Sequence, residues 1–167
     1  RELLLKMVAS ADVLVENYRL GVMERFGLGY EELREVNPRL VYACIRGFGD
    51  PRTGESPYAD WPAFDIVAQA VSGLMSTTGP GPGQPMKVGP GVGDIIPGML
   101  CAVGILAAVR HADQTGQGQF VDVAMYDGLL AMCERIIYRY SYTGDISEPE
   151  GNNHPTLCSF NLYPAKD

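Results

Sequence analysis

The hydrophobic positions of this chain fall into short segments with two different spacings. Residues 2–9 carry apolar side chains at helical spacing and predict an amphipathic helix. Asp12–Glu16 and Arg39–Gly47 are continuous apolar runs, as expected for strands buried in a parallel sheet. Gln119–Met125 alternates between apolar and polar residues, which is typical of a strand. The chain therefore predicts several strands that are separated by helical segments.

Helices are predicted where apolar residues recur every three or four positions. The predicted helices are Gly21–Phe26, Tyr30–Val36, Phe64–Met75, Asp94–His111 and Asp127–Tyr140. Polar or Gly/Pro-rich loops are predicted at Phe48–Trp61, Gly79–Gly93 and Thr143–Pro155, and residues 160–167 predict a further strand that runs into a turn. Because strands alternate with helices, the sequence predicts an α/β fold with a largely parallel sheet.

Composition narrows the class of protein. The 167 residues are 46% apolar, which is normal for a globular chain. The net charge of −7 argues against a nucleic-acid partner, since phosphate binding needs a basic surface. The apolar run between Asp94 and Arg110 contains Pro97 and is shorter than the roughly 18–20 residues of a membrane span. We therefore predict a buried helix there and no membrane partner.

The four cysteines give no sign of a metal site. They stand far apart, no Cys-x-x-Cys pair exists, and the chain has only two histidines. We expect neither zinc nor a disulfide framework, and interpret the thiols as small buried apolar groups. This cysteine usage favours a reducing, cytoplasmic location.

The segment Gly79–Gly93 holds six glycines and four prolines in fifteen residues and leads directly to Asp94. Two interpretations of Asp94 remain open. It could be the N-cap of a helix that has Pro97 in its first turn. It could also be a nucleophile toward an activated acyl group, with glycines allowing close approach and free helical N–H groups stabilising an oxyanion.

Four blocks of the sequence, in this order, carry a resemblance to a known family. They are LVENYRLGVMERFGLGYEELREVNPRLVYACIRGFG, FDIVAQAVSGLMSTTG, KVGPGVGDIIPGM and GQGQFVDVAMYDGLLA. From about Asp12 to Asp167 the chain resembles the class III CoA-transferases, a group that includes formyl-CoA transferase, carnitine CoA-transferase and the bile-acid-inducible protein F.

The resemblance implies a Rossmann-like parallel sheet with flanking helices, within the large domain of an interlocked homodimer. Residues 1–142 would be part of this CoA-binding and catalytic domain. Residues 143–167 would be a linker and the start of a small domain. Family members are considerably longer, so we expect this chain to be an internal segment.

The resemblance also implies roles for individual residues. Asp94 in VGDIIPGM aligns with the catalytic aspartate, which in the family forms a mixed anhydride and then an aspartyl-CoA thioester. Asp65 lies where some members carry a supporting carboxylate, although it could equally be a helix N-terminal charge. The residues expected to bind coenzyme A are Asn17, Val22, Arg25 and Phe26. Arg46 and Lys87 are weaker candidates and are predicted to lie at the surface.

The function implied is a CoA-transferase that moves CoA from an acyl-CoA to a small carboxylic acid, with coenzyme A as co-substrate and no metal. Dicarboxylates such as succinate, mesaconate or citramalate are plausible acids, as are carnitine-type acids. One alternative is an α-methylacyl-CoA racemase, but those enzymes carry a histidine where this chain has Phe64. A CoA-binding segment without activity of its own is the other alternative.

Overall fold

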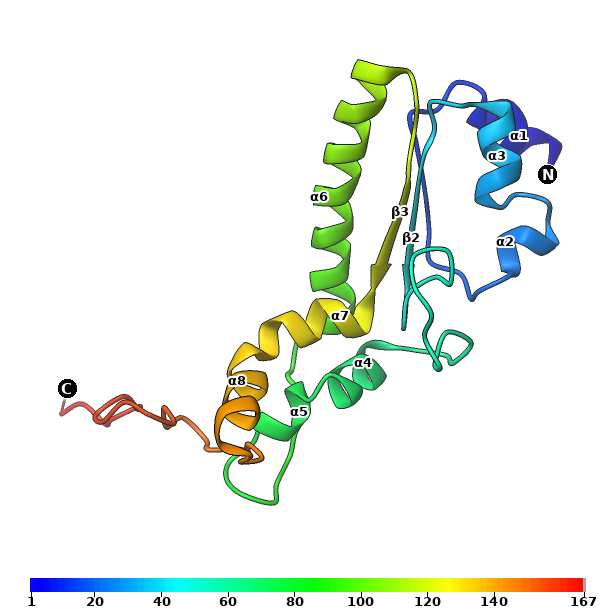
Figure 1. The fold of residues 1–167 in the computed structure, drawn as a ribbon. Coiled ribbons are helices and arrows are strands. Elements are labelled where there is room, and N and C mark those ends of the chain that lie inside the picture. The colour runs from blue at the N-terminus through cyan, green and yellow to red at the C-terminus, as the bar shows by residue number, and fades with distance from the viewer. Residues whose placement is uncertain (167) are drawn as a thin grey trace.

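The computed structural model describes residues 1–166, and its centre is a three-stranded parallel sheet (Figure 1). The strands are β1 (Val13–Glu16), β2 (Val41–Arg46) and β3 (Phe120–Ala124), in the spatial order β1-β2-β3. Val13 pairs with Val41, and Tyr42 pairs with Phe120. β2 is the central strand and almost entirely buried. The predicted α/β class with a parallel sheet is confirmed.

Helices cover both faces of the sheet (Figure 1). One face carries α1 (Glu2–Val8), α2 (Val22–Arg25) and α3 (Tyr30–Val36), and the other carries α6 (Val92–Thr115). The core on the first face consists of Val8, Met23, Leu28, Leu33, Leu40, Tyr42 and Cys44. Burial of this apolar surface is the main force that holds these helices on the sheet.

The remaining helices lie beyond the carboxyl ends of the strands (Figure 1). They are α4 (Asp65–Val71), α5 (Leu74–Thr77), α7 (Met125–Leu130) and α8 (Glu134–Thr143), with a 3₁₀ turn at Ala131–Cys133. A second apolar cluster of Ala68, Met125 and Leu129 joins α4 to α7. These helices therefore close one end of the sheet.

Besides α6, which is described in the next paragraph, three predicted elements differ from the structure. Phe64–Met75 is not one helix, because Gly73 adopts a left-handed conformation with φ 87° and separates α4 from α5. The predicted helix Asp127–Tyr140 is divided by the 3₁₀ turn. Residues 160–166 form no strand, so that prediction was wrong; Asp167 lies outside the described residues. A strand at this position has no neighbouring described strand to pair with.

α6 is the largest correction. It is 24 residues long, with a mean hydropathy of 2.1 in its most apolar stretch, and is long and apolar enough to cross a membrane by those two measures. Only 22% of that stretch is buried, so the expected short buried helix was wrong in length and in burial. Pro97 is the sixth residue of the helix, so it lies beyond the first turn in which the sequence analysis placed it.

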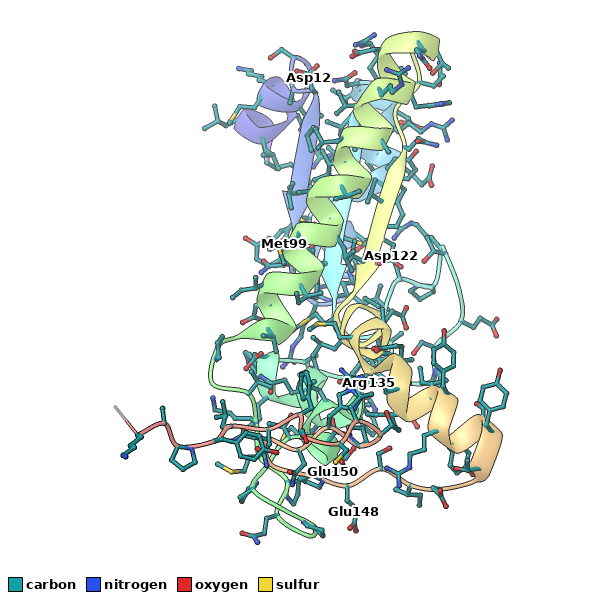
Figure 2. All side chains as sticks on the ribbon, turned by 90° about the vertical axis from the view of Figure 1, so that its left-hand side faces the viewer. Asp12, Met99, Asp122, Arg135, Glu148 and Glu150 are labelled. Carbon is teal, nitrogen blue, oxygen red and sulfur yellow. The ribbon has the colours of Figure 1, made fainter. Side chains whose placement is uncertain are left out.

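The two sides of α6 differ in side-chain size. Small buried residues, Cys101 and Ala108 among them, lie on the side that packs on β2 and β3. Larger apolar residues are exposed on the opposite side, including Met99, which is labelled in Figure 2. Small side chains let the helix axis approach the sheet closely, and leave the longer side chains pointing outward.

We predict that Leu33→Ala lowers the free energy of unfolding by about 2–5 kcal/mol, because Leu33 is fully buried between α3 and the sheet. The control is Leu3→Ala in α1, where the side chain is 72% exposed and the expected change is below about 0.5 kcal/mol. Urea unfolding of the protein that carries this chain measures both. Equal effects of the two substitutions would contradict the assignment of the core.

Candidate active site

A cavity of about 550 Å³ lies at the carboxyl ends of the three strands. The segment after β1, the glycine after β2 and the methionine after β3 all contribute to its wall. Its lining consists of residues 17–20, Arg25, residues 45–47, residues 59–64, Asp94 and Met125. Ligands of open parallel sheets bind in the crevice outside the carboxyl ends of the strands. The cavity therefore occupies the position where this type of sheet holds its ligand.

The structure brings three of the predicted site residues to this cavity. Asn17, Arg25 and Asp94 come from distant parts of the sequence, and all three line it. Val22 and Phe26 do not, and Phe26 is 61% exposed. The two apolar residues share the α2 turn with Arg25, so sequence proximity alone suggested them. Asp65 is not among the residues that line the cavity, and its contacts are described below.

The cavity carries cations that have no partner within residues 1–166. Arg19 and Arg25 are both exposed, and neither makes an ion pair with a described residue. Guanidinium groups bind phosphate and carboxylate oxygens through parallel hydrogen bonds. Arg19 was missed by the sequence analysis, although it lies two residues after Asn17 in the same loop. The pair suits an anionic ligand in an acidic protein.

Aromatic side chains also line the cavity. Trp61 and Phe64 line the cavity and are 57% and 71% exposed. The Trp61 ring packs on Tyr58 with a centroid separation of 4.8 Å, which fixes its orientation. Gly47 allows this segment to approach the end of β2, because a Cβ atom there would overlap Ala63. The cavity thus offers both charged and flat apolar surface.

Arg46, a weaker candidate for charge near the site, also lines the cavity, but the prediction that it lies at the surface was wrong. Its residue exposure is 6%, and its guanidinium forms ion pairs with Glu16 at 2.8 Å and with Asp50. Glu16 also accepts a hydrogen bond from the Tyr18 backbone N–H at 2.7 Å. The buried cation therefore fixes the start of the loop that carries Asn17. Lys87 is exposed, as predicted.

Asp94 is the third residue of α6, and the N-cap is Gly91. The N-cap interpretation was therefore wrong in position, because the helix begins two residues earlier than its apolar pattern indicates. The exposed Asp94 side chain lines the cavity instead.

The first N–H groups of α6 are not free to stabilise an oxyanion, which corrects the sequence-based expectation. The Val92 N–H donates to the Pro90 carbonyl at 2.8 Å, and the Ile95 N–H donates to the Gly91 carbonyl at 3.0 Å. The Gly93 N–H donates to Asp65 Oδ1 at 2.8 Å. The turn before the helix and the Asp65 carboxylate therefore occupy these donors.

Asp65 contacts the glycine-rich segment before Asp94 from the side of α4. A Cβ atom placed on Gly91 would lie 3.6 Å from Asp94 Oδ2 and 3.9 Å from Asp65 Cγ, so the two carboxylates flank this glycine. Asp65 also accepts hydrogen bonds from Gln69, a fully buried residue that the sequence analysis missed. The sequence contains one signal that could have identified Gln69: it lies four residues after Asp65, in a helix that is otherwise apolar.

The cysteines supply no competing nucleophile in the cavity. Burial raises the pKa of the Cys44 thiol, and the neighbouring Asp122 carboxylate acts in the same direction, so the thiolate is disfavoured. Cys101 and Cys133 are also buried, as predicted, whereas Cys158 is exposed and corrects that prediction. No cysteine is among the residues that line the cavity.

A larger cavity of about 710 Å³ lies between α5, α8 and residues 145–156. Both arginines in its lining are already paired with carboxylates: Arg139 contacts Glu150 at 3.3 Å, and Arg135 contacts Glu134 at 3.6 Å. Arg135 and Glu150 are labelled in Figure 2. None of the predicted site residues lines this cavity. The smaller cavity at the strand ends is therefore the candidate active site.

The chain belongs to CoA-transferase family III, whose family model matches residues 1–167. It is 54% identical over its whole length to the succinyl-CoA:mesaconate CoA-transferase of Haloarcula hispanica, and spans 42% of that protein. It is 43% identical to the acetyl-CoA:oxalate CoA-transferase of Acetobacter aceti, again over the whole chain and 42% of the relative.

Solved structures support the same fold. A CaiB/BaiF family protein from Brucella suis superimposes with a TM-score of 0.87 at 34% identity, over 96% of this chain and 41% of that one. The chain thus spans less than half the length of the relatives it matches. The sequence-based family assignment is confirmed.

We predict that Arg46→Met lowers the free energy of unfolding by about 3–5 kcal/mol, because it leaves the Glu16 and Asp50 carboxylates buried without their shared cation. The control is Arg39→Met, which removes an exposed ion pair with Asp113 and should cost at most about 1 kcal/mol. Chemical denaturation measures both. An Arg46 variant as stable as the Arg39 variant would show that the buried network is not as described.

Proposed function

We propose that the protein carrying this chain is a CoA-transferase that moves CoA from an acyl-CoA donor to a small carboxylic acid through Asp94. One observation carries the proposal: the Asp94 carboxylate shares a single cavity with Asn17, Arg19 and Arg25. Transfer of CoA needs a nucleophile that attacks the thioester, and the Asp94 carboxylate can serve as one. It also needs cations that bind the phosphates of CoA, and the two arginines can supply them. Family membership supports the same chemistry.

The first half of the reaction uses the donor. Ionised Asp94 attacks the thioester carbonyl of the acyl-CoA, the carbon–sulfur bond breaks, and CoA leaves as a thiolate. This gives a mixed anhydride between the acyl group and Asp94. The thiolate then attacks the Asp94 carbonyl of the anhydride and releases the donor acid. Asp94 now carries CoA as a thioester.

The second half repeats these steps with the acceptor. The acceptor carboxylate attacks the Asp94 thioester, displaces the CoA thiolate and forms a second mixed anhydride. The thiolate attacks the acceptor carbonyl, which yields the new acyl-CoA and restores the Asp94 carboxylate. One thioester is exchanged for another, so atoms and charge balance without a further reactant.

The remaining cavity residues position the carrier. In this proposal Arg25 and Arg19 bind CoA phosphates by charge-assisted hydrogen bonds, and Asn17 supplies a neutral donor or acceptor on the same side. The exposed faces of Trp61 and Phe64 provide apolar surface for the acyl group or the pantetheine. Holding the thioester beside Asp94 replaces a bimolecular encounter by a local one.

The acid is proposed to be a small dicarboxylate of the succinate and mesaconate type. The 54% identical relative is named a succinyl-CoA:mesaconate CoA-transferase, and another relative, 40% identical, is named a succinate–glutarate CoA-transferase. We further propose the interlocked homodimer implied by the family resemblance. The exposed apolar side of α6 supports additional protein packing on that helix.

We predict that Asp94→Asn abolishes CoA transfer, because the amide is a poor nucleophile and cannot carry the acyl group. Wild-type protein incubated with succinyl-CoA and then hydroxylamine should yield a hydroxamate on the Asp94 peptide, detected by mass spectrometry. The control is Asp113→Asn, an exposed aspartate at the far end of the same helix, which should retain activity and the adduct.

Two outcomes would contradict the proposed function. One is an active Asp94→Asn enzyme together with a wild-type protein that gives no hydroxamate. The other is rapid exchange of the α-proton of a 2-methylacyl-CoA in deuterium oxide without transfer of CoA, which would favour a racemase. Phe64 stands at the position where the racemases carry a histidine, and no histidine lines the cavity within the described residues.

We predict that Arg25→Met raises the KM for the acyl-CoA by about tenfold or more, since a charge-assisted hydrogen bond contributes about 1.5–3 kcal/mol. The effect should shrink as salt is added, because salt screens the exposed phosphate contact. Arg34→Met removes an exposed arginine of α3 away from the cavity and should leave the KM unchanged. A KM insensitive to Arg25 would exclude this residue from the CoA site.

A further inference from the structure

The side chain of Gln69 is the one polar group of α4 that is completely buried in the described structure. Its Nε2 group lies 2.9 Å from both oxygens of Asp65, one helical turn earlier. Its Oε1 atom accepts the backbone N–H of Val88 at 2.8 Å. A carboxylate only accepts and a backbone N–H only donates, so this pair of partners fixes the orientation of the amide. Gln69 therefore joins α4 to the loop that precedes Asp94.

Asp65 continues this connection toward the nucleophile. Its Oδ1 atom accepts the Gly93 N–H at 2.8 Å, and Gly93 is the residue immediately before Asp94. Gly93 is buried, and a Cβ atom there would lie 2.8 Å from the Asp65 carbonyl oxygen. The starts of α4 and α6 thus lie in direct contact, and the contact leaves no room for a larger residue.

The two connections fix both ends of residues 89–93. Gln69 binds Val88 directly before this segment, and Asp65 binds Gly93 at its end. Three of the five residues are glycines, which adopt many backbone conformations unless contacts restrict them. Within the described residues, these are the side-chain hydrogen bonds from α4 that restrict the segment. Hydrogen bonds from α4 therefore hold both ends of the segment that leads to Asp94.

We propose that Gln69 is a positioning residue for the reaction: through Asp65 and Val88 it fixes the loop that sets the place of the Asp94 carboxylate. The inference rests on the proposed function of Asp94. It also assigns Asp65 to this connection, because both of its oxygens already accept hydrogen bonds and Asp65 does not line the cavity. Substitution of Gln69 should impair the chemical step and leave CoA binding, which uses Arg25, largely intact.

Gln69→Glu is the sharpest single substitution. It keeps the size of the side chain and an acceptor for Val88, but it replaces the donor to Asp65 by a second carboxylate. Repulsion between the two carboxylates should displace Asp65 from Gly93. A displacement of about 1 Å at the nucleophile should lower kcat by about a hundredfold, with a change in KM for the acyl-CoA below about threefold.

A swapped pair provides the rescue. In the double variant Asp65→Asn/Gln69→Glu, the amide at position 65 can accept the Gly93 N–H and donate to the carboxylate at position 69. That carboxylate can still accept the Val88 N–H. All the connections are then restored with the same numbers of amides and carboxylates. We expect the double variant to recover at least about tenfold of the lost kcat, an interaction between the two sites that a double-mutant cycle measures.

The exposed Gln114→Glu substitution, near the end of α6, is the matched control and should leave kcat and KM unchanged. Thermal unfolding is recorded for every variant. If Gln69→Glu does not fold, the comparison uses the swapped pair against Asp65→Asn alone, and the pair must have the higher kcat. Unchanged kcat in a folded Gln69→Glu variant, or a folded swapped pair no better than the single variants, would overturn the inference.

Asp94→Asn separates this inference from the proposed function. If Asp94→Asn is inactive while Gln69→Glu has full activity, the positioning role fails and the aspartate mechanism stands. If Asp94→Asn retains transfer activity, the proposed function itself fails, whatever the Gln69 variants do.

Discussion

The parallel alignment of the three strands is the constraint on which the site depends. Because β1, β2 and β3 run in the same direction, the segments that follow them emerge at one edge of the sheet. Asn17 follows β1 and Gly47 follows β2, and both reach the same cavity. The buried Arg46 guanidinium reinforces this edge, because it ties Glu16 of β1 to Asp50 of the loop after β2. The buried ion pairs and the candidate active site therefore lie at the same end of the sheet.

Beyond the sheet, helix α4 restricts the conformation of the glycine-rich segment that precedes Asp94. The glycines before Asp94 remove side chains that would block a substrate, but they also remove the restriction that side chains place on the backbone. The buried Gln69 amide and the Asp65 carboxylate supply that restriction from α4. The arrangement combines an open approach to Asp94 with a fixed carboxylate.

The sequence predicted the parallel sheet, and pointed to Asp94 as a candidate site residue, because both signals are local. Strand β2 is a continuous apolar run, and Asp94 follows an unusual Gly/Pro segment. The burial of Arg46 was not predictable, since its partners Glu16 and Asp50 meet it only after the strands pair. The exposure of one side of α6 was not predictable for the same reason. The composition shows that the helix is apolar, but not which of its residues contact the rest of the chain.

Gln69 and Arg19 were not among the site residues predicted from the sequence. Gln69 lies in a helix that hydrophobic spacing predicts correctly, yet its contact with Val88 joins residues nineteen positions apart. Arg19 is a candidate because the loop after β1 lines the cavity, and no local sequence pattern indicates this. Conversely, Val22 and Phe26 are close to Arg25 in the sequence, but they are not among the residues that line the cavity.

The central claim, that Asp94 exchanges its own oxygen atoms with the substrates, is most directly tested by isotope transfer. The enzyme is allowed limited turnover with an acyl-CoA and an acceptor acid whose carboxylate oxygens are heavy, and the Asp94 peptide is then analysed by mass spectrometry. The anhydride pathway predicts that one heavy oxygen from the acceptor remains in Asp94 after each transfer. Heavy oxygen confined to the acid and the acyl-CoA, while transfer proceeds, would contradict the account.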